Sequence, residues 1–405
     1  MAATSGASGK ARPGQSPAGK AASRRLRRRV FYVAGFDPAS PRKYHGIFSV
    51  EAARQAALTG ASIEVGPLVE HGPIESGWDV RALLGGREVE IDYRCLRWND
   101  LVRQMWPREG LGFFLAVWRA FIVYWRRGVL DLPGWTVKVT AIAPVAAMSL
   151  FILLYGLAVL GLCLAGARVA QGEGWPWATL GLPPLLLWLA AVPVWKRLDR
   201  WAPVTWLGRG MICVSGASPR PHPAFEERLR QFAQRLVEVA REPGWDEILV
   251  IGHSMGCQQA ARAVGQALQL DPGFGLTGPK VSLLTLGQLI PLYSLMTDDE
   301  TYRRDLRTLA EAAQVDWLDI TGPSDPGSIC DVHPLFGLGF EPPEARPVRQ
   351  SPRFHAVLTK ATYRALRRRP LDFHFQYLMA TELAGGYDYF RLTTGPDCLI
   401  RAGAA

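Results

Sequence analysis

The residues with the clearest chemical potential lie in one short segment, Gly252 to Gly256 (GHSMG). Residues 247–251 (EILVI) are predicted to form a buried strand before it, and residues 257–268 (CQQAARAVGQAL) a helix after it. A serine at this junction sits on a tight turn, and only small neighbours let the strand and the helix approach each other. Such a turn exposes the Ser254 hydroxyl as a nucleophile and directs the Met255 backbone N–H at a developing oxyanion. The alternative is a glycine-rich turn without chemistry.

A serine hydroxyl is a weak nucleophile, so it needs an imidazole to accept its proton. With a turn of this kind the histidine comes last in the chain, after the nucleophile and the acid. His374, within the segment DFHFQYL, is the predicted base. His355 is the second choice and His333 the third, and each of them could instead be a structural or surface histidine.

The imidazole in turn needs a carboxylate to orient it. Asp325 lies in a turn-rich loop directly after a predicted strand at 315–320, which makes it the predicted acid. Asp331 comes slightly late in that loop, and Asp319 lies within the strand. Both remain alternatives, and any of the three could simply cap a turn.

A second oxyanion donor is expected in the loop after the first strand, predicted at residues 30–34 (VFYVA). Gly35 leaves room for a close backbone approach, so the Phe36 N–H is the natural donor. The alternative is that Gly35 only turns the chain.

The elements that position these residues alternate between strand and helix. Further strands are predicted at 88–96, 211–214 and 281–286, and helices at 49–59, 223–241 and 306–314. This order predicts an α/β fold with a mostly parallel sheet and helices on both faces. The first part of that domain spans residues 30–110, and the second part, with the serine turn, spans residues 201–405.

Residues 111–200 interrupt the domain with apolar sequence. Residues 139–167 contain no charge and are long enough to span a membrane, and residues 177–195 form a second, shorter uncharged run with three prolines. We predict a two-helix transmembrane hairpin with cytoplasmic ends, because cationic residues flank its outer ends. A re-entrant second segment and a buried soluble hairpin are the alternatives. Residues 111–129 could form an interfacial helix or a helix that covers the sheet.

The net charge of +10 is concentrated near the amino terminus. Residues 1–29 are rich in Lys, Arg, Ala, Gly and Ser and are predicted to form a disordered basic tail. The tail lacks interleaved aromatic residues, so it favours anionic lipid over nucleic acid as its partner. The six cysteines are scattered, with no metal-ligand spacing, which suits reduced thiols and predicts neither a metal site nor a cofactor.

Together these residues resemble the α/β-hydrolase superfamily of serine hydrolases. The resemblance rests on the GHSMG segment and residues 30–38. It also rests on the WLDI strand with Ser324-Asp325-Pro326 and on the segment HFQYL that begins at His374. It implies Ser254 as nucleophile, His374 as base, Asp325 as acid, and Met255 and Phe36 as oxyanion donors. The loop after the first strand lacks the His-Gly pair common in the family, and the hairpin insertion is unusual for it.

The sequence therefore predicts a serine hydrolase of the esterase or lipase type, held at the cytoplasmic face of a bacterial-type inner membrane. Its expected substrate is a carboxylic ester, with a lipid or acyl ester first. The alternatives are an inactive membrane scaffold on the same fold and an acyltransferase that uses the same triad. The sequence leaves the oligomeric state open.

Overall fold

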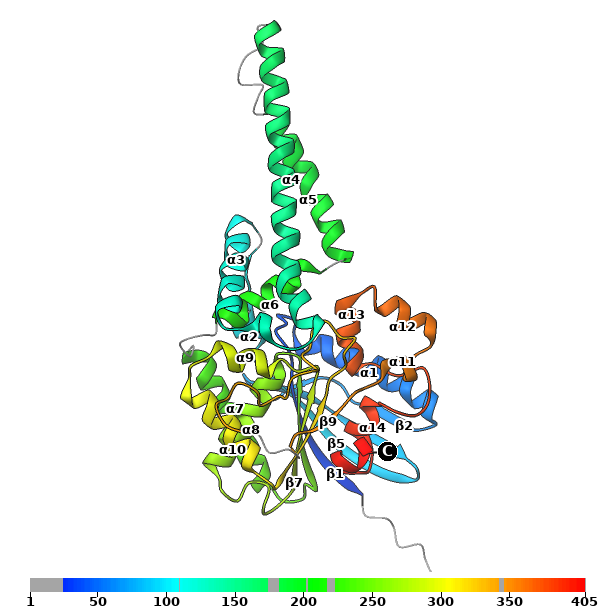
Figure 1. The fold of residues 1–405 in the computed structure, drawn as a ribbon. Coiled ribbons are helices and arrows are strands. Elements are labelled where there is room, and N and C mark those ends of the chain that lie inside the picture. The colour runs from blue at the N-terminus through cyan, green and yellow to red at the C-terminus, as the bar shows by residue number, and fades with distance from the viewer. Residues whose placement is uncertain are drawn as a thin grey trace, which may run out of the picture.

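A nine-stranded sheet organises the chain (Figure 1). The computed structural model describes residues 25–108, 110–173, 182–201, 203–216, 223–341 and 346–404. The strands are β1 (Leu26–Val33), β2 (Ser62–Val65), β3 (Val69–Glu70), β4 (Glu75–Leu84), β5 (Arg87–Leu96), β6 (Glu247–His253), β7 (Lys280–Leu286), β8 (Val315–Ile320) and β9 (Val348–Gln350). They lie in the order β2-β4-β5-β1-β6-β7-β8-β9, and β3 pairs with β4.

Helices surround this sheet and extend away from one end of it (Figure 1). In the first half of the chain they are α1 (Pro41–Thr59), α2 (Asn99–Met105), α3 (Leu111–Arg126), α4 (Trp135–Glu173), α5 (Leu182–Trp201) and α6 (Val204–Gly216). The second half adds α7 (Pro223–Arg241), α8 (Gly256–Leu270), α9 (Ile290–Met296), α10 (Glu300–Glu311), α11 (Phe354–Val357), α12 (Lys360–Leu366), α13 (Pro370–Phe375), α14 (Tyr389–Thr394) and α15 (Leu399–Ala404). The described residues also contain the short 3₁₀ segments η1 (Val129–Asp131) and η3 (Gln376–Leu378).

The sheet is parallel from β5 to β9 and antiparallel where β2, β3 and β4 join it. β1 lies in the middle, and its successive side chains enter two different cores. Phe31 and Val33 pack on the side of α7, α8 and α10, whereas Val30 and Tyr32 pack on the side of α1 and α14. Both faces of the sheet are therefore covered, which is why its central strands are continuously apolar. The predicted α/β fold with a mostly parallel sheet is confirmed.

Five strand assignments differ from the sequence prediction, which did not include β2, β3 or β9. Residues 211–214, predicted as a strand, lie inside α6. β4 was not predicted, although it pairs with β5 across Gly85 and Gly86, which have φ values of 57° and 76°. Two glycines with positive φ between alternating strands are typical of a tight hairpin, so the signal was present in the sequence.

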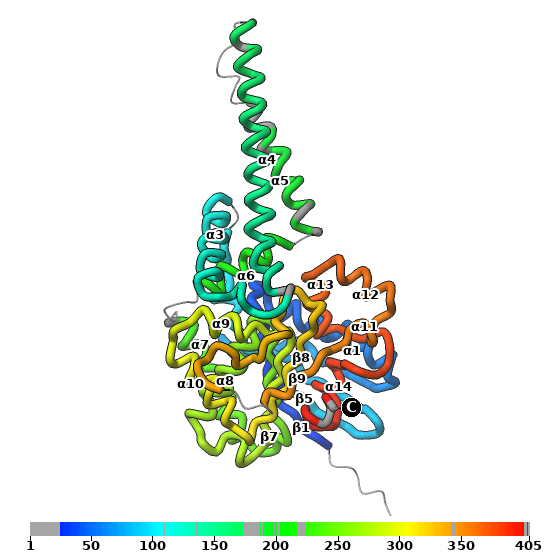
Figure 2. Tube along the Cα trace, viewed as in Figure 1, coloured from blue at the N-terminus to red at the C-terminus, as the bar shows by residue number. Residues whose placement is uncertain are grey.

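The predicted basic tail ends earlier than residue 29. Residues 1–24 lie outside the described residues, but β1 begins at Leu26 and contains three arginines of the supposed tail. Arg28 is fully buried; it pairs with Glu247 at 2.7 Å and donates to carbonyl groups near the end of the chain. Figure 2 shows that end beside β1. The charge that the sequence assigned to lipid binding is in part structural.

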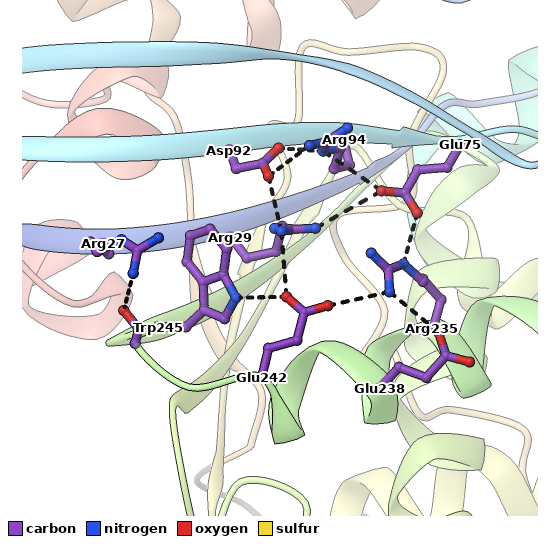
Figure 3. A network of polar contacts seen from close by, with 10 residues as sticks. Arg27, Arg29, Glu75, Asp92, Arg94, Arg235, Glu238, Glu242 and Trp245 are labelled. Carbon is purple, nitrogen blue, oxygen red and sulfur yellow. Dashed lines mark hydrogen bonds and ion pairs between the residues drawn. The ribbon is translucent and has the colours of Figure 1, made fainter. Parts of the chain in front are cut away.

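Arg29 belongs to a second group of charges, which lies between β1, β4, β5 and α7 (Figure 3). Its guanidinium is 2.9 Å from Asp92, and Arg94 binds the same carboxylate. Glu75 accepts a hydrogen bond of 2.9 Å from Arg235 on α7. The network thus joins the antiparallel end of the sheet to the helix that precedes the serine strand.

The apolar run forms one long helix that projects from the domain (Figure 1). Within α4, residues Val137–Val169 are long and apolar enough to cross a membrane, and none of the most apolar 18-residue stretch is buried. Among the described residues no other helix meets these criteria. The predicted pair of spanning helices is therefore corrected to one candidate span, and length and composition alone are weak evidence for it.

The second predicted run, residues 177–195, is described only from residue 182, within α5. This helix lies beside α4, where the rings of Phe151 and Trp195 are 4.9 Å apart. Its last turns carry Lys196, Arg197, Asp199 and Arg200. These charges explain why α5 does not qualify as a span, although its 20 residues are long enough.

α3 has two different faces. Phe113, Val117, Ala120 and Tyr124 are buried, and Val117 packs closely against α6 at Gly208. The opposite face exposes a stripe of large apolar side chains: Leu111, Leu115, Trp118, Ile122 and Trp125. The helix thus packs through one face and leaves an apolar face uncovered next to the base of α4 (Figure 1).

Candidate active site

The predicted site residues meet at the carboxyl ends of the parallel strands. Gly35 and Phe36 follow β1, Ser254 follows β6, and Asp325 lies in the loop after β8. His374 comes from α13, far along the chain. The carboxyl edge of a parallel sheet is the usual place for a ligand site, because the loops that leave its strands converge there.

Ser254 occupies the strained turn that the sequence predicts. Its φ of 57° is one of two positive values among the described non-glycine residues. The flanking glycines have no space for a side chain: a Cβ at Gly252 would lie 2.5 Å from the Cα of Cys257, and a Cβ at Gly256 only 2.2 Å from the Val33 carbonyl oxygen. Strained backbone of this kind costs on the order of 1–3 kcal/mol and persists where the surroundings enforce it.

The predicted acid and base form a direct pair. The Nδ1 atom of His374 lies 2.8 Å from Oδ2 of Asp325, and both residues are buried. Burial opposes ionisation of Asp325, but the His374 ring and hydrogen bonds from His374 and the Gly327 N–H outweigh it and lower the pKa of this carboxyl. The Nε2 atom of His374 is buried and has no hydrogen-bond partner among the described residues. The ring is therefore held through one nitrogen, while the other has no partner among the described residues.

The alternative histidines and acids lie elsewhere. His355 is exposed beside Tyr363, and the ring of His333 accepts a hydrogen bond from the Leu335 backbone. Asp331 is exposed, and Asp319 is buried within β8, where it accepts a hydrogen bond from Thr285. Among the described contacts, none of these four joins the pair of Asp325 and His374.

The two predicted oxyanion donors have backbone N–H groups that are not engaged elsewhere among the described residues. Neither the Phe36 nor the Met255 backbone N–H donates a hydrogen bond within the described part of the chain. A Cβ at Gly35 would lie 2.9 Å from the Ser254 Cβ, so the loop after β1 passes directly over the serine. Backbone N–H groups placed in this way can stabilise negative charge that develops on a substrate oxygen.

Sequence reasoning missed two glycines that make room for the imidazole. A Cβ at Gly327 would lie 2.6 Å from Nδ1 of His374, and one at Gly287 would lie 3.1 Å from its Cε1. Gly287 also has a φ of 59°. Gly287 directly follows one predicted strand and Gly327 lies in the loop after another, but only the tertiary approach of His374 shows why a side chain is excluded.

His253, inside the serine segment, also acts on the imidazole. Its ring is buried, which lowers its pKa to about 3, with the neighbouring His374 adding to the effect. The neutral ring uses its Nε2–H to donate to the His374 backbone carbonyl at 3.1 Å. His253 thereby fixes the backbone position of the predicted base.

Ser254 and His374 both line a cavity of about 530 Å³. Its walls carry many charged groups: Asp37, Lys43, Asp199, Arg200, Arg209, Arg369 and Asp372. Several are paired, such as Lys43 with Asp37 at 2.6 Å and Arg369 with Asp372 at 2.8 Å. The cavity therefore combines these charged groups with aromatic walls such as Trp106, Trp206 and Phe375, and it is called the polar cavity below after its charged groups. The residues that the structure describes contain no cluster of three or more His, Cys, Asp or Glu suited to a metal ion.

No family model, curated protein or solved structure matches this chain. The fold and the arrangement of the candidate site therefore carry the functional argument, and the resemblance to α/β-hydrolases remains a prediction.

Proposed function

We propose that this protein is a serine hydrolase of the α/β-hydrolase superfamily that cleaves carboxylic esters. Ser254 attacks the ester carbonyl while His374 Nε2 takes the hydroxyl proton. The oxyanion accepts hydrogen bonds from the Phe36 and Met255 N–H groups. The imidazolium then gives its proton to the leaving alcohol, and an activated water hydrolyses the acyl-enzyme.

One observation carries the proposal: an imidazole bound by a buried, ionised aspartate and a serine at φ 57° line the same cavity. A structural histidine would ordinarily satisfy both ring nitrogens when buried. Here the second nitrogen has no partner among the described residues. The strain at Ser254 is also costly for a turn without chemistry.

The uncovered apolar surfaces support a membrane location. α4 exposes large side chains along much of its length, and the outer stripe of α3 lies near its base. An apolar surface of this extent on a water-soluble protein favours aggregation, whereas lipid would cover it. We propose that α4 inserts into the membrane and that α3 lies at its surface, which makes a membrane-derived acyl ester the leading substrate.

A fluorophosphonate probe and a chromogenic ester test the chemistry together. The full chain in detergent should be labelled and should hydrolyse p-nitrophenyl esters. Ser254→Ala should lose both, with a fall in kcat on the order of 10⁴-fold or more, because the variant lacks the nucleophile. Since only one oxygen is removed, the thermal unfolding temperature should change little.

Ser49→Ala is the matched control, because that hydroxyl lies on α1 and bonds only the His45 carbonyl among the described contacts. It should keep both labelling and activity. Absence of labelling and of ester cleavage in the unsubstituted protein would favour the inactive scaffold. An ester product formed with an added alcohol would favour the acyltransferase.

Extraction of cell membranes with alkaline carbonate tests the location. Insertion of α4 predicts that the protein stays in the membrane pellet, because carbonate removes proteins held only by charge. Release into the supernatant would show that the apolar face of α4 is covered by protein and not by lipid.

A further inference from the structure

A second cavity meets the first at Ser254. It has a volume of about 80 Å³ and is lined almost entirely by apolar side chains. Phe36 and Met255, the two predicted oxyanion residues, line it together with Ser254. Its other walls include Tyr124 of α3, Met211 of α6 and Leu292 of α9. This space, the apolar slot, is smaller than the polar cavity, shares Phe36, Trp206 and Ser254 with it, and is lined by none of its charged residues.

The direction of proton transfer indicates which part of the ester lies in which cavity. The oxygen of a leaving alcohol must lie within hydrogen-bond reach of His374 to receive its proton. His374 lines the polar cavity and does not line the apolar slot. The alcohol part of an ester bound at Ser254 therefore lies in the polar cavity, and the carbon chain on the other side of the carbonyl is left with the slot.

We propose that the apolar slot binds the acyl chain of the substrate and that Gly210 of α6 sets how much chain it accepts. This inference rests on the proposed hydrolase function. A Cβ at Gly210 would lie 3.3 Å from the terminal methyl of Met255, so a side chain there would occupy the slot. Tyr124, Thr140, Gly210 and Met211 all belong to the helices between β5 and α7. The segment that carries the candidate membrane helix thus also builds the specificity pocket.

The size of the slot limits the acyl group. About 15 Å³ of such space holds one water-sized group, so 80 Å³ holds roughly five methylene-sized groups. Burial of one methylene favours binding by about fourfold. An unbranched chain of about six carbons should therefore react best, and an acetyl group should leave most of the slot empty.

The test compares kcat/KM for p-nitrophenyl hexanoate and p-nitrophenyl acetate, with the full chain in detergent. The unsubstituted protein should prefer hexanoate by at least about tenfold. Gly210→Val should lower this hexanoate-to-acetate ratio by at least about tenfold, because the three carbon atoms of its side chain take up a large part of the slot. Valine remains compatible with the helix, since the nearest neighbour is the movable end of Met255.

Gly216→Val is the matched control, because it makes the same change on the same helix where an added Cβ meets no atom within 4 Å. It should leave the ratio unchanged. Leu292→Ala provides the opposite change, since a shorter side chain enlarges the slot and should raise the rate with octanoate relative to hexanoate by about threefold or more.

The outcomes separate this proposal from the hydrolase proposal. The protein could hydrolyse esters while none of the variants changes the hexanoate-to-acetate ratio, or while Gly216→Val changes it as much as Gly210→Val. Either result would contradict the acyl-chain role of the slot and leave the hydrolase proposal in place. Failure of the unsubstituted protein to react with either ester or with the fluorophosphonate probe would overturn the hydrolase itself.

Discussion

The interior of β8 and the loop that follows it each bury an aspartate, but in different surroundings. Among the described contacts, Asp319, within β8, accepts hydrogen bonds only from hydroxyl groups, at 2.7 Å from Thr285 and 3.3 Å from Thr321. Asp325, in the loop, binds the His374 ring and the Gly327 N–H, each at 2.8 Å. Both carboxyls are completely buried.

Burial raises the pKa of both carboxyls, and their hydrogen-bond partners decide whether this effect prevails. Burial raises the pKa of Asp319 to about 6, because hydroxyl groups compensate a buried charge only in part. Burial also opposes the charge on Asp325, but an imidazole that can become cationic and direct hydrogen bonds lower its pKa. A buried aspartate is thus suited to orient and stabilise an imidazolium only where such a partner contacts it, and in β8 and its loop that is Asp325.

The largest effect that tests this difference is expected from Asp325→Asn. The amide keeps the shape of the side chain but presents no negative charge, and it favours the wrong tautomer of His374. We expect kcat for p-nitrophenyl hexanoate to fall by about 10⁴-fold. Circular dichroism and thermal unfolding should show that the fold persists.

Asp331→Asn is the control for this variant, because it removes a charge six residues further on, at an exposed position. It should keep nearly full activity. Normal activity of Asp325→Asn combined with loss in Asp331→Asn would move the orienting acid to Asp331 and contradict the comparison.

Local patterns were enough to predict the parts of the fold that are continuous in sequence. The strands around Val30, Ile251, Leu284 and Leu318 were recognised because both of their faces are buried and their apolar runs are unbroken. The serine turn could be predicted because its glycines and its flanking elements are adjacent in the chain. The pairing of Asp325 with His374 followed from chain order and chemistry, and the structure brings these two side chains together.

Features that depend on distant residues were missed. Arg28 looks like part of a basic tail until Glu247, 219 residues later, is placed beside it. Gly327 looks like a loop residue until His374 packs against it. Residues 211–214 are apolar and short, so they suggested a strand, whereas their neighbours complete a helix that packs against α3.

The membrane segment shows how far composition alone can be used. The uncharged run of α4 is long and apolar enough to be recognised as a candidate span from the sequence alone. Residues 177–195 were judged by the absence of charge in that window, but the helix they enter continues to Trp201 and gains four charged side chains. Helix ends depend on packing and capping, so the boundaries of the uncharged window did not predict the boundaries of α5.

The smallest expected effect concerns the pH dependence of stability through Asp319. A carboxyl with a pKa near 6 in the folded state and about 3.9 when unfolded binds its proton more tightly in the folded protein. Its contribution to stability is therefore complete below about pH 4 and is lost as the pH rises through 6. Asp319→Asn removes this loss, since its amide can still accept from Thr285 and donate to Thr321. The free energy of unfolding of the variant, relative to the unsubstituted protein, should rise by on the order of 1–3 kcal/mol between pH 4.5 and pH 7.5.

Urea unfolding in detergent at the two pH values measures this difference, and ester hydrolysis should be unchanged. A difference that does not vary with pH would show that Asp319 is ionised in the folded protein throughout. Loss of activity in this variant, with Asp325→Asn active, would transfer the orienting role to β8.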